Sequence, residues 1–237
     1  MLITIGFFLM SVPLFVGAYK MFRTRLLLGL AGVGRAYGTF YLGLGLFLFT
    51  ISVTNSISLS PILLQRIIYF SLFGELYIAL GFMYLFSFML ADKKMIGFIL
   101  LGIHIFFAIL FLYFYIPEAS GVVTLLPNNK LFQYKDPGYS IFSTLFSLML
   151  VISAASTYSR FLLKTGIASS SMLIRKRSFI FAIGSVIAAF SGSSYFISPL
   201  LLESARPYVV AVASIPGIVG FTLMVLPLFL KEKTKLS

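Results

Sequence analysis

The chain has 237 residues, of which 60% are hydrophobic and only 10% charged, and its formal net charge is +12. A water-soluble domain carries about a quarter charged residues, so this composition excludes a soluble globular fold. The absence of Cys excludes disulfides, thiol catalysis and Cys-ligated zinc or iron–sulfur sites.

Seven apolar segments follow one another along the chain, and each is long enough to cross the ~30 Å hydrocarbon layer of a bilayer as a helix. Only short loops remain between them. The sequence therefore predicts an all-α integral membrane protein that forms one transmembrane domain over residues 1–237. The predicted helices cover residues 2–22, 36–54, 62–90, 95–116, 139–163, 177–197 and 207–230.

The connections between these segments differ in charge, because one alternating set holds 14 Lys and Arg residues and the other holds four. Basic loops face the cytoplasm, so the N-terminus is predicted outside and the C-terminus inside the cell membrane. The same asymmetry accounts for most of the net charge, which removes the main support for nucleic acid as a stable ligand. The predicted partners are the lipid bilayer and anionic lipid headgroups at the basic inner loops.

The longest loop, residues 117–138, lies on the predicted outer side. Two apolar runs within it, residues 122–126 and 130–134, flank the turn-forming sequence Pro127-Asn128-Asn129. This pattern is typical of a small β-hairpin that caps the bundle. An irregular loop lying on the headgroups is the alternative.

The two predicted three-helix halves of the chain, residues 1–91 and 139–237, align with each other at a shift of 139 positions. Because both would run inward first, they would be parallel three-helix repeats, joined by the linker helix and outer loop of residues 92–138. Apolar helices also match one another by composition, so chance similarity is the alternative. The matched pairs include Tyr19 with Tyr158, Gly45 with Gly184 and Ser52 with Ser191.

A plan of three, one and three helices with the N-terminus outside resembles that of the sugar-transporting SWEET family, in which parallel repeats surround the substrate site. The resemblance implies a transport architecture. The Pro-Gln motif of the related PQ-loop proteins is absent, since Pro13 is followed by Leu14. The resemblance therefore covers the architecture and no residue of that family is carried over.

Two ionisable residues lie near the centres of predicted helices: Glu75 in the third and His104, the one histidine, in the fourth. A carboxylate inside a membrane is costly unless it is paired or protonated, so Glu75 is a candidate proton or cation site with His104 as its partner or relay. The structural alternative is a protonated carboxyl bonded to a Ser or Tyr hydroxyl, with His104 as a neutral donor between helices. Tyr77 is expected to line the same pocket.

The last predicted helix contains Ser214, Pro216 and Gly217 near its middle. Proline removes a backbone hydrogen bond and glycine loosens the turn, so a kink or break is predicted there. Interrupted helices often border transport sites, where freed carbonyl oxygens coordinate ligands. A kink that serves packing alone is the alternative.

The sequence contains no catalytic, metal or cofactor signature, since it has one His, no Cys, no phosphate-binding glycine loop and no carboxylate pair on one helix face. A non-enzymatic small-solute or ion transporter or channel is predicted, with a central cavity lined by Glu75, Tyr77 and Ser214. The alternative function is that of a non-catalytic membrane subunit of a respiratory, secretion or DNA-uptake complex. Partner subunits, or further copies of the chain in a homo-oligomer, are the other expected partners. The scarcity of Gln and Asn, two and three residues, favours a thermophilic source.

Overall fold

The computed structural model describes residues 2–23, 31–57, 59–115, 123–126, 129–132, 137–197, 201 and 205–230. Within these residues, seven helices are long and apolar enough to cross a membrane, which confirms the predicted number of spans. The fold is that expected of a polytopic membrane protein. Its elements are α1 (Leu2–Arg23), α2 (Ala31–Ser56), α3 (Pro61–Tyr69), the π-helix η1 (Phe70–Leu76), α4 (Tyr77–Leu90), α5 (Lys94–Tyr115), β1 (Val123–Leu126), β2 (Asn129–Phe132), α6 (Pro137–Ala168), α7 (Met172–Ile197), α8 (Arg206–Val225) and the short 3-10 helix η3 (Leu226–Phe229).

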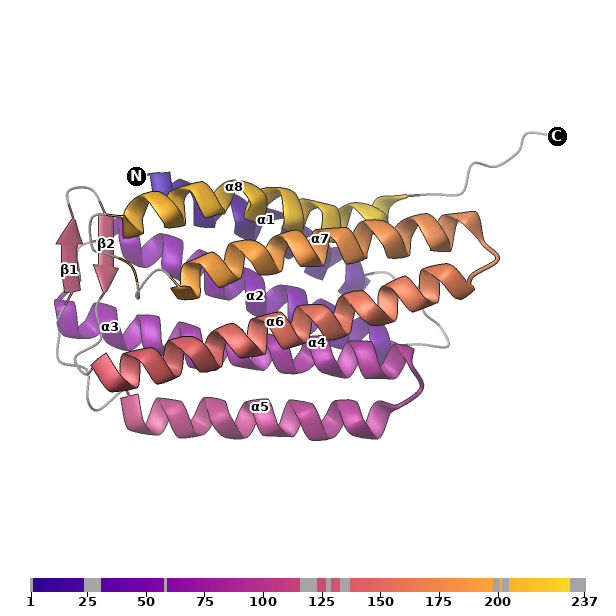
Figure 1. Cartoon of the computed structure of the whole chain (residues 1–237), viewed down its shortest axis with the longest axis horizontal. Coiled ribbons are helices and arrows are strands. Elements are labelled where there is room, and N and C mark those ends of the chain that lie inside the picture. Colours follow the sequence, from indigo (N-terminus) through magenta and orange to yellow (C-terminus); the bar gives the residue numbers. More distant parts are fainter. Residues whose placement is uncertain are drawn as a thin grey trace.

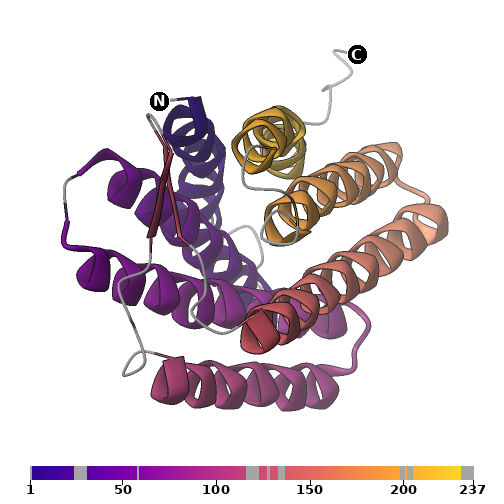
Figure 2. The same cartoon turned by 60° about the vertical axis from the view of Figure 1, so that its left-hand side comes forward.

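Six of the seven spans form a closed ring. The order of neighbours around the ring is α1, α2, α4, α6, α7 and α8, and α8 packs against α1 again. The helix α5 lies outside this ring and packs against η1 and α4 (Figures 1 and 2). The first three spans therefore meet the last three at two contacts, α4 with α6 and α1 with α8.

Small residues allow the backbones of α7 and α8 to approach closely. A Cβ atom on Gly220 would lie 2.5 Å from the backbone nitrogen of Ala188, and one on Gly184 would lie 2.8 Å from the carbonyl oxygen of Gly220. Lipid tails are as apolar as the helices themselves, so packing of this kind is a main source of helix association in membranes. This contact fixes α8 against the rest of the ring.

The hairpin predicted in the long loop is present. Strands β1 and β2 are antiparallel, and Val123 pairs with Phe132 while Leu126 pairs with Asn129. The hairpin lies at the end of the bundle where α1 begins (Figure 1). We call this end the hairpin end and the opposite one the basic end.

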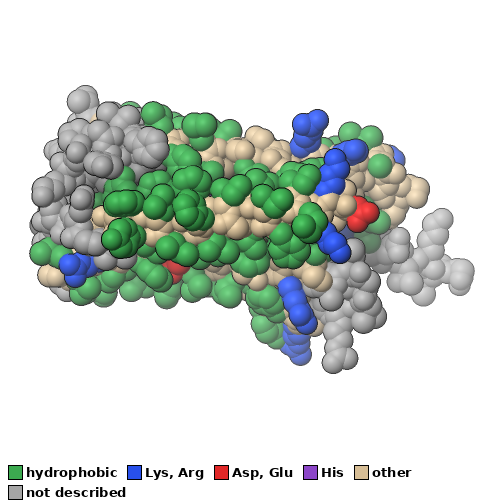
Figure 3. Space-filling model, turned by 90° about the horizontal axis from the view of Figure 1, so that it is seen from below, with side chains coloured by type: hydrophobic (Ala, Val, Ile, Leu, Met, Phe, Trp, Pro, Cys, Tyr) green, Lys and Arg blue, Asp and Glu red, His purple; other side chains and the backbone are tan. Residues whose placement is uncertain are grey.

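Charge separates along the bundle as the loop analysis predicted. Most of the described Lys and Arg side chains gather at the basic end, and hydrophobic side chains cover the surface between the two ends (Figure 3). Arg66, on α3, lies near the hairpin end. The described Lys and Arg residues of the basic end are Lys20, Arg23, Arg35, Lys93, Lys94, Arg160, Lys164, Arg175, Lys176 and Arg177.

Residues paired by the proposed repeat have different surroundings. The hydroxyl of Ser52 donates to the carbonyl oxygen of Thr4 in α1 at 2.9 Å, whereas that of Ser191 donates to Ala213 in α8 at 2.7 Å. These acceptors belong to the first helix of one half and to the third helix of the other. The ring order is the one that two parallel halves would produce, but the matched side chains are not equivalent, so the duplication stays a prediction.

Candidate functional site

The third span is irregular at its centre. It runs from Pro61 to Leu90, and its seven middle residues, Phe70–Leu76, form the π-helix η1. A π-helix bonds each carbonyl five residues along instead of four, and such segments are rare and frequently occur at functional sites. Glu75 lies inside η1 and is the fifteenth of the thirty residues of this span, so it sits at mid-depth.

No break interrupts the last span at Pro216, because α8 is continuous from Arg206 to Val225, and a kink there stays a prediction. Proline removes a single N–H donor, and neighbouring helices can satisfy the carbonyl groups around it. Here the hydroxyl of Ser191 on α7 donates to the carbonyl oxygen of Ala213 at 2.7 Å. Gly217 fits closely against Met10 and Ser191, so α1 and α7 support α8 on both sides of the proline.

Two hydroxyl groups hold the Glu75 carboxyl group. Ser71, one turn earlier in η1, donates to Oε2 at 2.5 Å, and Thr50 of α2 donates to Oε1 at 3.3 Å. The side chain is half-buried. Among the described residues no cationic group pairs with it; its polar contacts there are these two hydroxyls.

Glu75 faces away from the centre of the ring. Its neighbour Leu76 lines a central cavity, whereas Glu75 is absent from the lining and bonds to Thr50 at the contact of η1 with α2. The expectation that Glu75, Tyr77 and Ser214 line the central cavity is therefore wrong, since none of the three does so. The extra residue per turn in η1 changes which side chains face inward along this span, and that change is invisible in the sequence.

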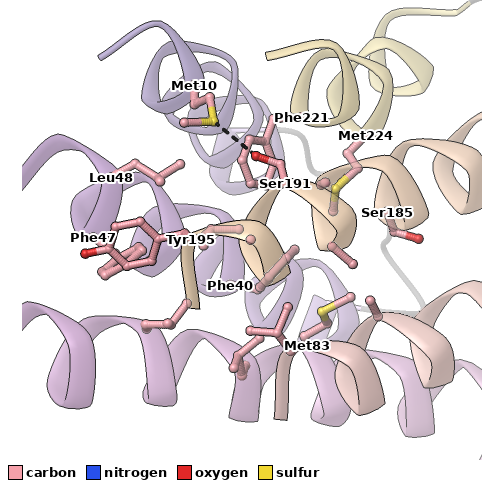
Figure 4. A pocket seen from close by; sticks show the side chains of 18 of the residues that line it. Met10, Phe40, Phe47, Leu48, Met83, Ser185, Ser191, Tyr195, Phe221 and Met224 are labelled. Carbon is pink, nitrogen blue, oxygen red and sulfur yellow. Dashed lines mark hydrogen bonds between the residues drawn. The ribbon is translucent and has the colours of Figure 1, made fainter. Parts of the chain in front are cut away.

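The central cavity has a volume of about 80 Å³ and is lined by side chains of all six ring spans. Figure 4 shows Met10, Phe47, Met83, Ser191 and Phe221 converging on it from five helices. Phe, Leu, Met and Ala dominate the lining, and the polar side chains are those of Ser185, Ser191 and Tyr195. The cavity is therefore suited to a small and largely apolar molecule.

Three buried tyrosines, Tyr37, Tyr41 and Tyr158, bond to one another or to Met224, which itself lines the cavity. Tyr41 donates to the carbonyl oxygen of Met224 at 2.5 Å, the hydroxyls of Tyr37 and Tyr158 lie 2.7 Å apart, and Tyr37 also bonds to Tyr41. One assignment uses every hydroxyl hydrogen: Tyr158 donates to Tyr37, Tyr37 to Tyr41, and Tyr41 to the carbonyl. The tyrosine cluster thus joins α2, α6 and α8, and sequence reasoning missed it because these residues are 121 and 183 positions apart.

His104 does not pair with Glu75. Its Nδ1 atom bonds to the carbonyl oxygen of Leu100 in its own helix at 2.7 Å, and its ring lies 5.1 Å from that of Tyr84. Because a carbonyl oxygen can only accept, Nδ1 carries a hydrogen. The other nitrogen, Nε2, is buried and has no partner among the described residues.

Replacing His104 by Leu is expected to change the free energy of unfolding by less than ~1 kcal/mol. An unpaired buried nitrogen is costly, so an apolar side chain of similar size is close to neutral or stabilising there. Thermal unfolding of the detergent-solubilised protein, followed by circular dichroism, measures the change. A loss above ~2 kcal/mol would mean that the imidazole makes a necessary polar contact.

Tyr77 and Ser214 lie at the two contacts between the halves of the ring. The Tyr77 hydroxyl bonds to that of Ser147 on α6 at 3.0 Å. Ser214 donates to the carbonyl oxygen of Ala211 in its own helix at 2.6 Å and packs against Gly6 of α1. Both residues therefore make contacts that hold spans together, and the hydroxyls that bond to the Glu75 carboxyl group belong to Ser71 and Thr50 instead.

The Tyr77–Ser147 bond can be measured by a double-mutant cycle of Tyr77→Phe and Ser147→Ala. Hydrogen bonds between membrane helices contribute about 0.6 kcal/mol on average and up to ~1.7 kcal/mol. We expect a coupling energy in that range from chemical unfolding in mixed micelles. A coupling energy of zero would show that the two hydroxyls do not stabilise the α4–α6 contact.

Among the described residues no group of three His, Asp or Glu side chains could hold a metal ion. The site therefore consists of one carboxyl group, two hydroxyls and the adjacent apolar cavity. Comparison with known proteins gives no family for the chain: no protein-family model matches it, and no curated protein is significantly similar to it in sequence.

Proposed function

We propose that the chain is a non-enzymatic transport protein of the cell membrane in which Glu75 binds and releases a proton during the movement of a small solute or ion. The hairpin end faces outside and the basic end inside. The observation that carries the proposal is the Glu75 site. Its carboxyl group lies in the π-helix η1 at mid-depth and accepts hydrogen bonds from the hydroxyls of Ser71 in η1 and Thr50 in α2.

A carboxylate at the centre of a membrane costs about 3 kcal/mol on insertion scales and more in simulations. The hydroxyls of Ser71 and Thr50 offset part of this cost in the charged form, and protonation removes it. In this proposal the carboxyl group is either charged or protonated, and its hydrogen bonds differ between these two states. That is the requirement for a residue that couples proton binding to a change in structure.

The position of η1 connects this carboxyl group to the cavity. Glu75 and Leu76 are consecutive, and Leu76 forms part of the cavity wall. A local return from π-helical to α-helical bonding would turn both residues about the helix axis. In the proposed mechanism, protonation of Glu75 changes its bonds to Ser71 and Thr50 and so moves the wall of the solute path.

The cavity defines the class of solute. Its lining offers three hydroxyl-bearing side chains and no charged group. A charged solute would lose its hydration without compensation there. The proposed substrate is therefore small and uncharged, and the tyrosine cluster forms the inner barrier of its path.

Proteoliposomes that contain the purified chain and an entrapped pH-sensitive dye test this proposal. One arm applies a potassium diffusion potential, and a second adds small uncharged solutes one at a time, including alcohols, sugars and amides. Protein-dependent acidification in either arm is expected. No change in internal pH in any arm, with the protein shown to be folded and inserted, would overturn the proposal.

A second candidate function is a membrane subunit of a larger assembly, and the outward position of Glu75 favours it. A half-buried carboxyl group at the contact of α2 and η1 would be covered if a helix of another subunit packed there. The described hydrogen bonds of Glu75 are with Thr50 of α2 and Ser71 of η1, and none of them is with the peripheral helix α5. In this proposal the partner helix supplies the group that pairs with Glu75.

A photo-crosslinking amino acid at Phe70 distinguishes the two proposals. Phe70 is 52% exposed and lies in η1, and Phe106 on α5 is a matched control at 61% exposure. A subunit interface predicts a discrete protein adduct in native membranes from position 70 and none from position 106. Lipid adducts alone at both positions would exclude a partner at the exposed face of η1.

A further inference from the structure

The outward face of α6 changes character along its length. Toward the middle of the helix it presents the exposed apolar side chains Met149 and Ile152, and one turn later the exposed hydroxyl of Ser156. Toward the basic end, this face of α6 carries a shallow and widely open groove, lined in part by Ser156, Arg160 and Lys164. Residues at these spacings share one face of a helix. This order of apolar, hydroxyl and cationic side chains is complementary to a phospholipid, whose acyl chains are followed by the glycerol region and then by the anionic phosphate.

The two cations of this groove are available to an external anion. Arg160 and Lys164 are four residues apart and both are exposed. Among the described residues, neither forms an ion pair or a side-chain hydrogen bond with another residue. The two described carboxyl groups lie elsewhere, Glu75 at mid-depth in η1 and Asp92 in the turn after α4.

The length of this face of α6 matches the thickness of one leaflet. Half of the ~30 Å hydrocarbon layer is about 15 Å, which corresponds to about ten helical residues. Ile152 and Met149 lie eight and eleven residues before Arg160, so both lie where acyl chains run when Arg160 lies at phosphate depth. Guanidinium groups bind phosphate oxygens in bidentate fashion, and a Lys one turn away adds a second charge.

We propose that this face of α6 binds one anionic phospholipid from the leaflet at the basic end. Its phosphate lies between Arg160 and Lys164, its glycerol region lies at Ser156, and one acyl chain lies along Ile152 and Met149. The groove is distinct from the Glu75 site, which lies on α2 and η1, and the inference does not depend on the proposed transport function.

Native mass spectrometry of the full chain tests the inference, with phosphatidylglycerol and phosphatidylcholine of identical acyl chains as probes. Two nearby cations are expected to favour the anionic lipid by about 30-fold. The variant R160Q/K164Q should lose this preference. The matched control K93Q/K94Q removes two exposed charges from the same end of the bundle and should retain it.

Retention of the preference by R160Q/K164Q would overturn the inference. Equal loss in both double variants would overturn it as well, because the preference would then follow total charge and not this groove. All four substitutions are at exposed positions. Equal thermal stability of the three proteins, measured without added lipid, shows that a lost preference does not reflect unfolding.

Discussion

Glu75→Gln is expected to reduce protein-dependent proton movement to the level of liposomes without protein. Glutamine keeps the size of the side chain and can still accept hydrogen bonds from Ser71 and Thr50, but it does not ionise. The protein should therefore fold normally and lose only the pH-dependent signal. The dye-loaded proteoliposomes described above measure this loss under a pH gradient of either sign.

Asp92→Asn is the matched control for this change. Asp92 is the other described acidic residue, is exposed, and has a positive φ of 57°, a conformation that Asn also tolerates. The Asp92→Asn variant should retain the proton signal of the unaltered protein. Unchanged proton movement in Glu75→Gln would remove Glu75 as the coupling group, whatever the solute is.

Gly220→Ala is expected to destabilise the bundle by about 1–3 kcal/mol or more, as overpacking of a tight contact does. The added Cβ atom would lie 2.5 Å from the backbone nitrogen of Ala188 and 2.9 Å from its Cα atom. Both neighbours are backbone atoms of α7, so the contact can be relieved only by separating the two helices. Thermal unfolding in detergent measures the effect as a lowered midpoint.

Gly102→Ala provides the comparison, because a Cβ atom there meets nothing within 4 Å. At such a position alanine gains about 0.5–1 kcal/mol over glycine within a helix. The two substitutions are chemically identical and are expected to have opposite signs. Equal effects at both positions would contradict the close packing of α7 on α8.

The spans, the hairpin and the basic end could be predicted because each depends on local composition. Lipid requires an uninterrupted apolar stretch in each helix, and the turn residues Pro127, Asn128 and Asn129 between two apolar runs suffice for a hairpin. Insertion rules place Lys and Arg in alternate loops. None of these features depends on which helices are neighbours.

The surroundings of Glu75 could be predicted only in part. Ser71 is one helical turn away, so a bond between the two side chains follows from spacing alone. Thr50 belongs to another helix, and its contact requires the packing of α2 on η1. The direction in which Glu75 points could not be predicted, because nearly every face of the spans is apolar and the π-helix changes the register within one of them.

The break that Pro216 could have caused is absent, and the support for this stretch of α8 comes from another helix. A proline predicts a weak point in an isolated helix, but the hydroxyl that bonds to the carbonyl oxygen of Ala213 comes from Ser191 on α7. A kink at Pro216 without a break stays a prediction. Conversely, η1 contains no proline, and its one glycine, Gly74, does not mark it as irregular in the sequence.

Labelling with dicyclohexylcarbodiimide tests the account most directly, because this apolar reagent reaches carboxyl groups from the lipid phase and reacts with their protonated form. We predict one adduct on Glu75, located by mass spectrometry of peptides, with a yield that falls as pH rises and with no adduct on Asp92. Glu75→Gln should remove the adduct. Absence of labelling at Glu75 at every pH, in protein that remains folded, would contradict the claim that Glu75 is a protonatable group open to the membrane.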